Sequence, residues 1–450
     1  MTRRLTRRGA LAAGGAVALA PLAGCSDVGG EPRFWDDPPS LDTDGIARAL
    51  DAPVPDSPRL VPVDIDPAVA AAFDDRIDRL LDPIPEPLTA SILPNAAVRE
   101  RIRERAAARE ARPSADESLP PVRVAERYAT ARDRAATAVG TWAGVTVEGD
   151  PAAATADVGP VRRRVSETLS TLPGPATDPL AGAAVYGPIE RWYDESRRRT
   201  LIGRGAGIAD RANPLRTGER VGDFERVQSH VEAGRHLRDR YRASLVDPEP
   251  VDEPLRAAAE RLGAAVRDRL LGLHGGDAER LRSNPGREAF LDERPVARDA
   301  PSVSLLSGAL YRTFEDLRFD PVPIDDREPE NPATALTRTA LARARLRGLD
   351  AVASRIEGGE TFFPEGAAAV EEARDAALDS AASLSTSGNP LDRWLAARFL
   401  PLFDEPDARL AATDPDVRDA AEAFAEYRWI DVVASEATAV TRSVAAALDE

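Results

Sequence analysis

The sequence predicts an all-α fold of about ten to twelve helices, arranged as a multi-helix array or as two packed bundles. Three observations lead to this prediction. Apolar residues recur three and four positions apart in one segment after another, as they do along one face of an α-helix. Asn-Pro and Asp-Pro pairs divide these segments. Alternating runs of β-branched residues, which indicate half-buried strands, are nearly absent, and Val145-Thr146-Val147 is the best short exception.

The first 25 residues carry the clearest motif in the chain. Arginines at positions 3, 4, 7 and 8 precede an apolar run that ends in Leu22-Ala23-Gly24-Cys25. The run, roughly 14 residues, is shorter than the ~20 that a membrane-spanning helix needs. This order resembles a twin-arginine export signal ending in a lipobox. The resemblance implies that residues 1–24 are a signal peptide and that lipid on Cys25 anchors the exported protein to the outer face of the cytoplasmic membrane.

Residues 25–62 hold this cysteine and a stretch rich in Pro, Gly and Asp that has no helical period. We expect this stretch to be a semi-rigid tether. The roughly 390 residues beyond it are enough for more than one hydrophobic core. We therefore predict one helical lobe over residues 63–247 and a second over 248–450, divided at Asp247-Pro248-Glu249-Pro250.

The composition is strongly acidic, and every basic residue is an arginine. Asp and Glu number 76 against 59 basic residues, which gives a net charge of −17, and removal of the four signal arginines makes it −21. This composition resembles that of proteins from extreme halophiles, of the haloarchaeal type. At about 1 M salt the Debye length is only ~3 Å, which screens the repulsion between carboxylates. We expect no nucleic-acid partner, because such a surface lacks the positive charge that binding requires.

Cys25 is the only cysteine of the chain. Internal disulfides and zinc sites with several thiolate ligands are therefore excluded. We expect no bound cofactor.

Seven predicted helix starts pair a capping residue with a proline. The side-chain oxygen of Asn or Asp accepts a free backbone N–H, and proline suits the first helical position. The pairs are Asp66-Pro67, Asp178-Pro179, Asn213-Pro214, Asn284-Pro285, Asn331-Pro332, Asn389-Pro390 and Asp414-Pro415.

Apolar stripes follow these starts. Val69, Phe73, Ile77 and Leu80 form the first stripe, and a long alanine-rich helix is expected over about 415–448. Trp394 and Trp429 are expected to fill the core.

Two of the three histidines, His230 and His236, lie on a helix predicted over about 219–245. His230 falls within or beside the apolar stripe, so we expect it at the edge of the core. His236 shares a polar face with Glu232 and Asp239, one histidine and two carboxylates at helical spacing, which is a candidate divalent-metal site or a solvated face. His274 is expected at the C-terminal end of a helix, where a cation suits the helix dipole.

The densest basic cluster outside the signal comprises Arg197, Arg198 and Arg199, with Arg204 in the glycine-rich segment that follows. It is a candidate site for an anion or an acidic partner, or an ordinary helix C-terminus. Just before it, Glu190, Asp194 and Glu195 flank Trp192 and Tyr193. Paired carboxylates beside an aromatic ring are found in glycosidases, but acids are so common in this chain that we attribute the pattern to chance.

No catalytic motif is recognised. We therefore interpret the chain as a lipid-anchored extracytoplasmic helical protein that binds or scaffolds a partner, which we expect to be a membrane protein. Two alternatives remain open. One is a ligand-capturing lipoprotein of a membrane transporter, and the other is an exported enzyme of unrecognised type that uses carboxylates or His236.

Overall fold

The computed structural model describes residues 33–41, 45–114, 119–146, 158–202, 213–273, 275, 287–319, 330–412 and 415–450. Over these ranges the all-α prediction is confirmed, with twelve α-helices of ten or more residues and a shorter one, α14. Extended backbone pairs there only at an isolated bridge between Ala176 and Glu249. In these same ranges, no helix is both long enough and apolar enough to cross a bilayer.

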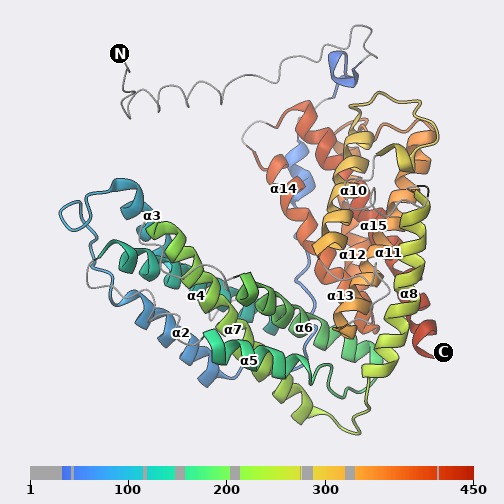
Figure 1. Ribbon diagram of the computed structural model, residues 1–450. Helices are drawn as coiled ribbons and strands as arrows, with labels where there is room; N and C mark the ends of the chain where they lie inside the picture. The colour runs from blue at the N-terminus through green and yellow to red at the C-terminus, as the bar shows by residue number, and fades with distance from the viewer. Residues whose placement is uncertain are drawn as a thin grey trace, which may run out of the picture.

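The described residues within 63–247 form a layered group of helices, which we call lobe 1 and which occupies the lower left of Figure 1. Its elements are α2 (Pro67–Leu81), α3 (Ala96–Ala106), the short 3₁₀ helix η3 (Ala107–Ala111), α4 (Pro121–Val145), α5 (Val158–Leu169), α6 (Pro179–Ile202) and α7 (Pro214–Ser244).

The described residues within 248–450 form lobe 2, a more upright bundle at the right of Figure 1. Its α-helices are α8 (Asp252–Leu273), α10 (Pro301–Phe319), α11 (Pro332–Glu357), α12 (Ala367–Ser385), α13 (Pro390–Phe399), α14 (Asp404–Leu410) and α15 (Val417–Leu448). Trp394 and Trp429 are buried in this lobe, as expected.

Four of the predicted caps are confirmed, since each side-chain oxygen accepts a backbone N–H from the first turn of its helix. They are Asp66, Asp178, Asn213 and Asn389, which begin α2, α6, α7 and α13. The helix α15 begins two residues later than predicted, because Asp416 and Asp419 form a capping box there. Asn331 precedes α11 but makes no capping bond, and Asn284 and Asp414 lie outside the described residues.

The antiparallel pair α4 and α7 is the centre of lobe 1. Glycines on α7 allow the backbones to approach closely: a Cβ on Gly218 would lie 2.6 Å from the carbonyl oxygen of Thr137 on α4. A buried carboxylate ties a third helix to the pair. Glu225 of α7 accepts from Arg76 of α2 at 2.8 Å and from Arg132 of α4 at 2.9 Å.

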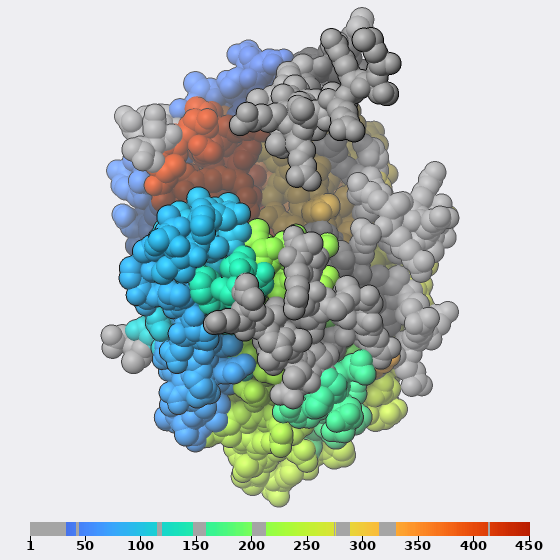
Figure 2. Space-filling view, turned by 60° about the vertical axis from the view of Figure 1, so that its left-hand side comes forward, coloured from blue at the N-terminus to red at the C-terminus, as the bar shows by residue number. Residues whose placement is uncertain are grey.

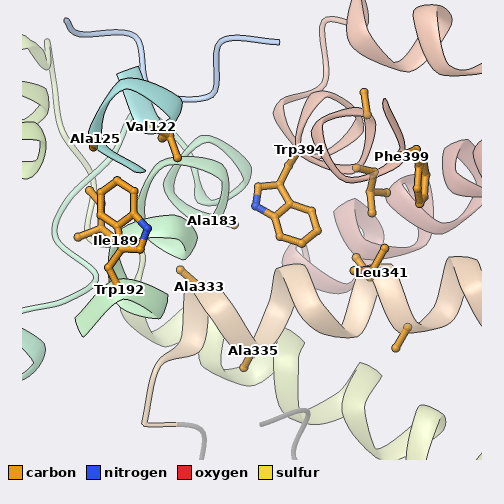
Figure 3. Close-up of a cluster of buried hydrophobic side chains, with 14 of the residues drawn as sticks. Val122, Ala125, Ala183, Ile189, Trp192, Ala333, Ala335, Leu341, Trp394 and Phe399 are labelled. Atoms are coloured by element: carbon orange, nitrogen blue, oxygen red, sulfur yellow. The ribbon is translucent and has the colours of Figure 1, made fainter. Parts of the chain in front are cut away.

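The helix α6 joins the two lobes, because one face packs on α7 and another on α11 and α13. Figure 3 shows the side chains at this junction. Trp192 lies among residues of lobe 1, and Trp394 lies above α11 beside Leu341 of lobe 2. A single cluster of buried apolar residues runs through both lobes. A smaller second core lies under α12, α14 and α15.

The expected tether over 25–62 is wrong for the part that the structure describes. The segment 45–62 contains the 3₁₀ helix η2 (Ile46–Leu50), which packs on α12 and α14, and Val61 is fully buried in the main core. In Figure 2 the earliest described residues, in dark blue, lie beside the orange-red helices of lobe 2. Buried Ile46 and Ala49, and the bond from Arg374 to the carbonyl of Ala52 (2.7 Å), hold this segment in place.

We predict that Gly218→Ala lowers the free energy of unfolding by about 1–3 kcal/mol, because the added methyl group meets backbone atoms of α4 that cannot move aside. Gly272→Ala on α8 is the matched control. Nothing lies within 4 Å of its Cβ position, so higher helix propensity should raise stability by up to about 1 kcal/mol. Guanidinium unfolding at molar salt measures both. Equal stability of the two variants would show that α4 and α7 are not in tight contact.

Candidate functional site

A cleft of about 770 Å³ opens in lobe 1 between the first half of α4, the C-terminal half of α6 and the middle of α7, with η3 at its edge. Its wall is unusually rich in arginine for so acidic a chain. The charged and polar side chains that line it are Glu110, Arg123, Glu126, Arg127, Thr130, Arg134, Arg191, Glu195, Arg226 and His230.

The helix α4 contributes one continuous stripe to this wall. Arg123, Arg127, Thr130 and Arg134 follow one another at spacings of four, three and four residues. Residues so spaced lie on one face of an α-helix. The opposite face of α4 is apolar or carries the buried bond to Glu225, so the stripe is directed away from the core and into the cleft.

A stacked pair of rings lines the inner part of the cleft. The imidazole of His230 lies parallel to the indole of Trp192, with centroids 5.4 Å apart and planes 9° apart. His230 is only 6% exposed, which confirms that it lies at the edge of the core. Burial lowers the pKa of His230 to about 4, although the negative charge of Glu195 opposes the shift. The imidazole is therefore neutral at pH 7 and has one nitrogen that donates and one that accepts.

Carboxylates hold several of the cleft arginines in place. Glu126 pairs with Arg123 at 3.1 Å and with Arg191 at 3.0 Å. Arg226 pairs with Asp133 at 3.2 Å. Pairing of this kind fixes the direction of a guanidinium while leaving some of its five N–H donors available.

The charge of the cleft is opposite in sign to that of the whole chain. Its lining holds five arginines and three glutamates, while the chain carries a net charge of −17. With His230 neutral, the five positive arginines and three negative glutamates give the lining a net charge of +2. Arg134 is exposed at the rim of the cleft. The arrangement can bind an anion through charge-assisted hydrogen bonds.

The arginines of the predicted anion site, Arg197, Arg198 and Arg199, pair with carboxylates of the protein itself. Arg197 pairs with Asp194 at 2.9 Å and also with Glu330, and Arg198 pairs with Asp194.

Arg199 pairs with Asp223 and with Glu195, the latter at 2.8 Å. Burial raises the pKa of Glu195, but Arg199 outweighs this effect and holds the pKa below its usual range. Arg197 and Arg199 therefore connect α6 to the segment before α11 and to α7, whereas Arg198 pairs with Asp194 within α6. Of this part of α6, the neighbouring Glu195 lines the cleft. Arg204, Cys25 and His274 lie outside the described residues.

The predicted metal-ligating set is not brought together. Glu232 bonds to Arg132 at 2.5 Å, and Asp239 accepts from Arg238 at 2.8 Å. His236 accepts from the backbone N–H of Asp66 at 3.0 Å and so ties α7 to the start of α2. The ranges that the structure describes contain no group of three or more potential metal-ligating residues.

Glu190 lies at the junction of the lobes rather than in the cleft. It is fully buried, and its Oε2 accepts from the backbone N–H of Thr334 at 2.7 Å. Thr334 is in the first turn of α11, so Glu190 on α6 supplies the cap that Asn331 does not. Burial raises the pKa of Glu190 to about 8, although the bonds from Thr334 oppose the shift. Glu190 and Glu195 therefore face different surroundings and do not form a carboxylate pair.

The arginines of the cleft were not predicted, because they are spread along the chain and form no dense cluster in the sequence. The useful signal was spacing: the stripe on α4, and Arg226 one helical turn before His230 on α7. No local pattern indicates that these two helices and α6 converge.

Two family models match the chain, and both describe domains of unknown function. Residues 68–247 match the Domain of unknown function (DUF8262), which includes the cleft, and residues 252–446 match the Domain of unknown function (DUF8264). The matches adjoin at the turn between α7 and α8. No curated protein and no solved structure matches the chain.

We predict that Glu190→Gln flattens the dependence of stability on pH. The pKa of Glu190 is raised in the folded protein, so its contribution is fully present below about pH 4.5 and is lost as the pH rises towards 8. Glutamine keeps the acceptor for Thr334 and does not ionise. At pH 8.5 the variant should exceed the original protein in free energy of unfolding by up to about 4–5 kcal/mol, and by less than about 1 kcal/mol at pH 5.

Guanidinium unfolding at the two pH values measures this difference. Glu100→Gln on the exposed face of α3 is the control, and it should leave the pH dependence unchanged. If Glu190→Gln and Glu100→Gln give the same pH profile, Glu190 is not a buried protonated cap.

Proposed function

We propose that this chain is a lipid-anchored binding protein on the outer face of the cytoplasmic membrane, and that the cleft between α4, α6 and α7 binds a small anionic ligand. One observation carries the proposal. Five arginines line a concave site in a chain whose net charge is −17. The lipid anchor and the export route rest on the sequence motif that ends at Cys25.

The size of the cleft supports a small-molecule ligand. Its volume of about 770 Å³ lies within the ~300–1,000 Å³ range of small-molecule sites. A surface that only scaffolds another protein would not require a hollow of this size. We therefore prefer a ligand-capturing protein to a protein that only scaffolds a partner.

The chemistry of the wall supports an oxyanion. The planar guanidinium groups of Arg127 and Arg134 lie on one face of α4 and match the geometry of a carboxylate or phosphate group. Across the cleft, the neutral His230 adds a hydrogen-bonding group without adding charge. A ligand with one anionic end and a polar remainder fits this combination.

Binding of this type persists in the concentrated salt that the composition suggests. At about 1 M salt, screening acts over ~3 Å and suppresses long-range attraction. Direct contact between a guanidinium and an oxyanion inside a cleft is screened much less. A multivalent oxyanion that takes two or more arginines can therefore compete with chloride.

We predict that Arg127→Gln with Arg134→Gln weakens anion binding by at least about tenfold. A hydrogen bond to a charged group contributes about 1.5–3 kcal/mol, so loss of one weakens binding by roughly 10- to 100-fold. Isothermal titration with citrate and with inorganic phosphate, in molar potassium chloride at constant pH, measures the dissociation constants.

Arg79→Gln on α2 is the matched control, because Arg79 is an exposed arginine outside the cleft. It should bind the probes as the original protein does. Absence of heat with both anions at millimolar concentration, or equal affinity of the double variant, would contradict the proposed function.

A further inference from the structure

The first described residues of the chain are fastened to one end of lobe 2. They include the 3₁₀ helix η1 (Phe34–Asp36). The backbone N–H of Phe34 donates to Oδ1 of Asp299 at 2.8 Å, and the indole N–H of Trp35 donates to the carbonyl oxygen of Asp299 at 3.0 Å. Asp299 lies just before α10.

Aromatic contacts complete this attachment. The ring of Phe34 lies 5.5 Å from that of Phe363, in the segment between α11 and α12, and 5.1 Å from that of Trp35. The guanidinium of Arg418, in the first turn of α15, lies over the Trp35 ring at 5.4 Å. We call Phe34, Trp35, Asp299, Phe363 and Arg418 the N-terminal clamp. It joins segments from three parts of lobe 2.

The clamp and lobe 1 lie at opposite ends of α11. Phe363 follows the C-terminal end of this helix, whereas Thr334, which Glu190 of lobe 1 caps, is in its first turn. At 1.5 Å per residue, the 26 residues of α11 span about 39 Å. Figure 1 shows the same arrangement, with α10 and the first described residues, in blue, at the top and the α7–α8 turn at the bottom.

The chain between the clamp and Cys25 is short. Nine residue steps separate Cys25 from Phe34, and at ~3.3–3.6 Å per residue even a fully extended segment spans only about 30 Å. A compact protein of this size has a radius of gyration of about 22 Å, hence a diameter near 57 Å. The segment between Cys25 and Phe34 is therefore at most about half as long as the molecule is wide.

From these lengths we propose that the clamp end of lobe 2 faces the bilayer and that lobe 1, with the arginine-lined cleft, is held on the side away from it. The partner of this surface is the headgroup layer of the membrane to which the protein is anchored. The inference rests on the lipid attachment at Cys25 that is part of the proposed function, and it does not depend on which anion the cleft binds.

The experiment is energy transfer from a labelled cysteine to a headgroup dye. Cys25 is the only cysteine and would carry the lipid, so an introduced cysteine is the single free thiol of the lipidated protein. Glu365→Cys places a donor at the clamp end, and Val246→Cys, at a side chain 78% exposed in the α7–α8 turn, places one at the far end. The lipidated protein is purified from its own membrane and reconstituted into vesicles that carry the acceptor dye.

Transfer from position 365 should be at least about twofold greater than from position 246, because the two ends of α11 are about 39 Å apart. Adding Trp35→Ala and Asp299→Ala releases the clamp and should reduce this difference. Tyr311→Ala, at an exposed aromatic of lobe 2 outside the clamp, should keep it.

Equal transfer from the two positions, or greater transfer from 246, would overturn the inference while leaving the lipid anchor intact. Failure of the protein to float with the vesicles would instead overturn the lipid attachment itself, and the orientation with it. The two failures are therefore distinguishable in one preparation.

Discussion

The close contact between α4 and α7 is the constraint on which the rest of lobe 1 depends. Gly140 and Gly218 allow the two backbones to meet without intervening side chains, and the threonines of α4 fill the space that remains. On one side of this pair, the buried carboxylate of Glu225 accepts hydrogen bonds from Arg76 and Arg132. These bonds fix α2 against both helices. Burial raises the pKa of Glu225, but the two arginines outweigh burial and hold it below its usual range.

The same pair forms the cleft on its other side. Because α4 and α7 are fixed in register, the arginine stripe of α4 lies beside Arg226 and His230 of α7 in the wall of the cleft, and Arg226 pairs with Asp133 of α4. The helix α6 closes the third side and continues into the junction with lobe 2, where Glu190 caps α11. In the proposed function, one helix therefore contributes both to the ligand site and to the connection between lobes. An acidic exterior with a locally basic hollow would favour anions in the cleft without making the whole surface positive.

The sequence was sufficient for the fold class and for most helix starts, because these depend on neighbouring residues. Asp66, Asn213 and Asn389 cap their helices as predicted, since a cap bond closes within three residues. Asn331 does not, because a carboxylate about 140 positions earlier in the chain takes its place. No local sequence pattern indicates the contact between Glu190 and Thr334.

The candidate site was harder to predict for the same reason. Arg197, Arg198 and Arg199 are adjacent in sequence and pair with Asp194 and Glu195 of the same helix. Arg197 and Arg199 also pair with Glu330 before α11 and Asp223 of α7, which no local pattern indicates. The tether prediction failed because Pro and Gly content predicts the absence of regular structure. It does not predict the absence of packing, and Val61 is buried.

The most direct test of the central claim is a crystal structure of the protein soaked with tungstate at molar potassium chloride, with an anomalous difference map. Tungstate is a divalent oxyanion, and the anomalous scattering of tungsten locates it directly in the map. The account predicts a peak in the cleft of lobe 1, within hydrogen-bond distance of Arg127 or Arg134. Tungstate bound only elsewhere on the protein, with the cleft free of anomalous signal, would contradict it.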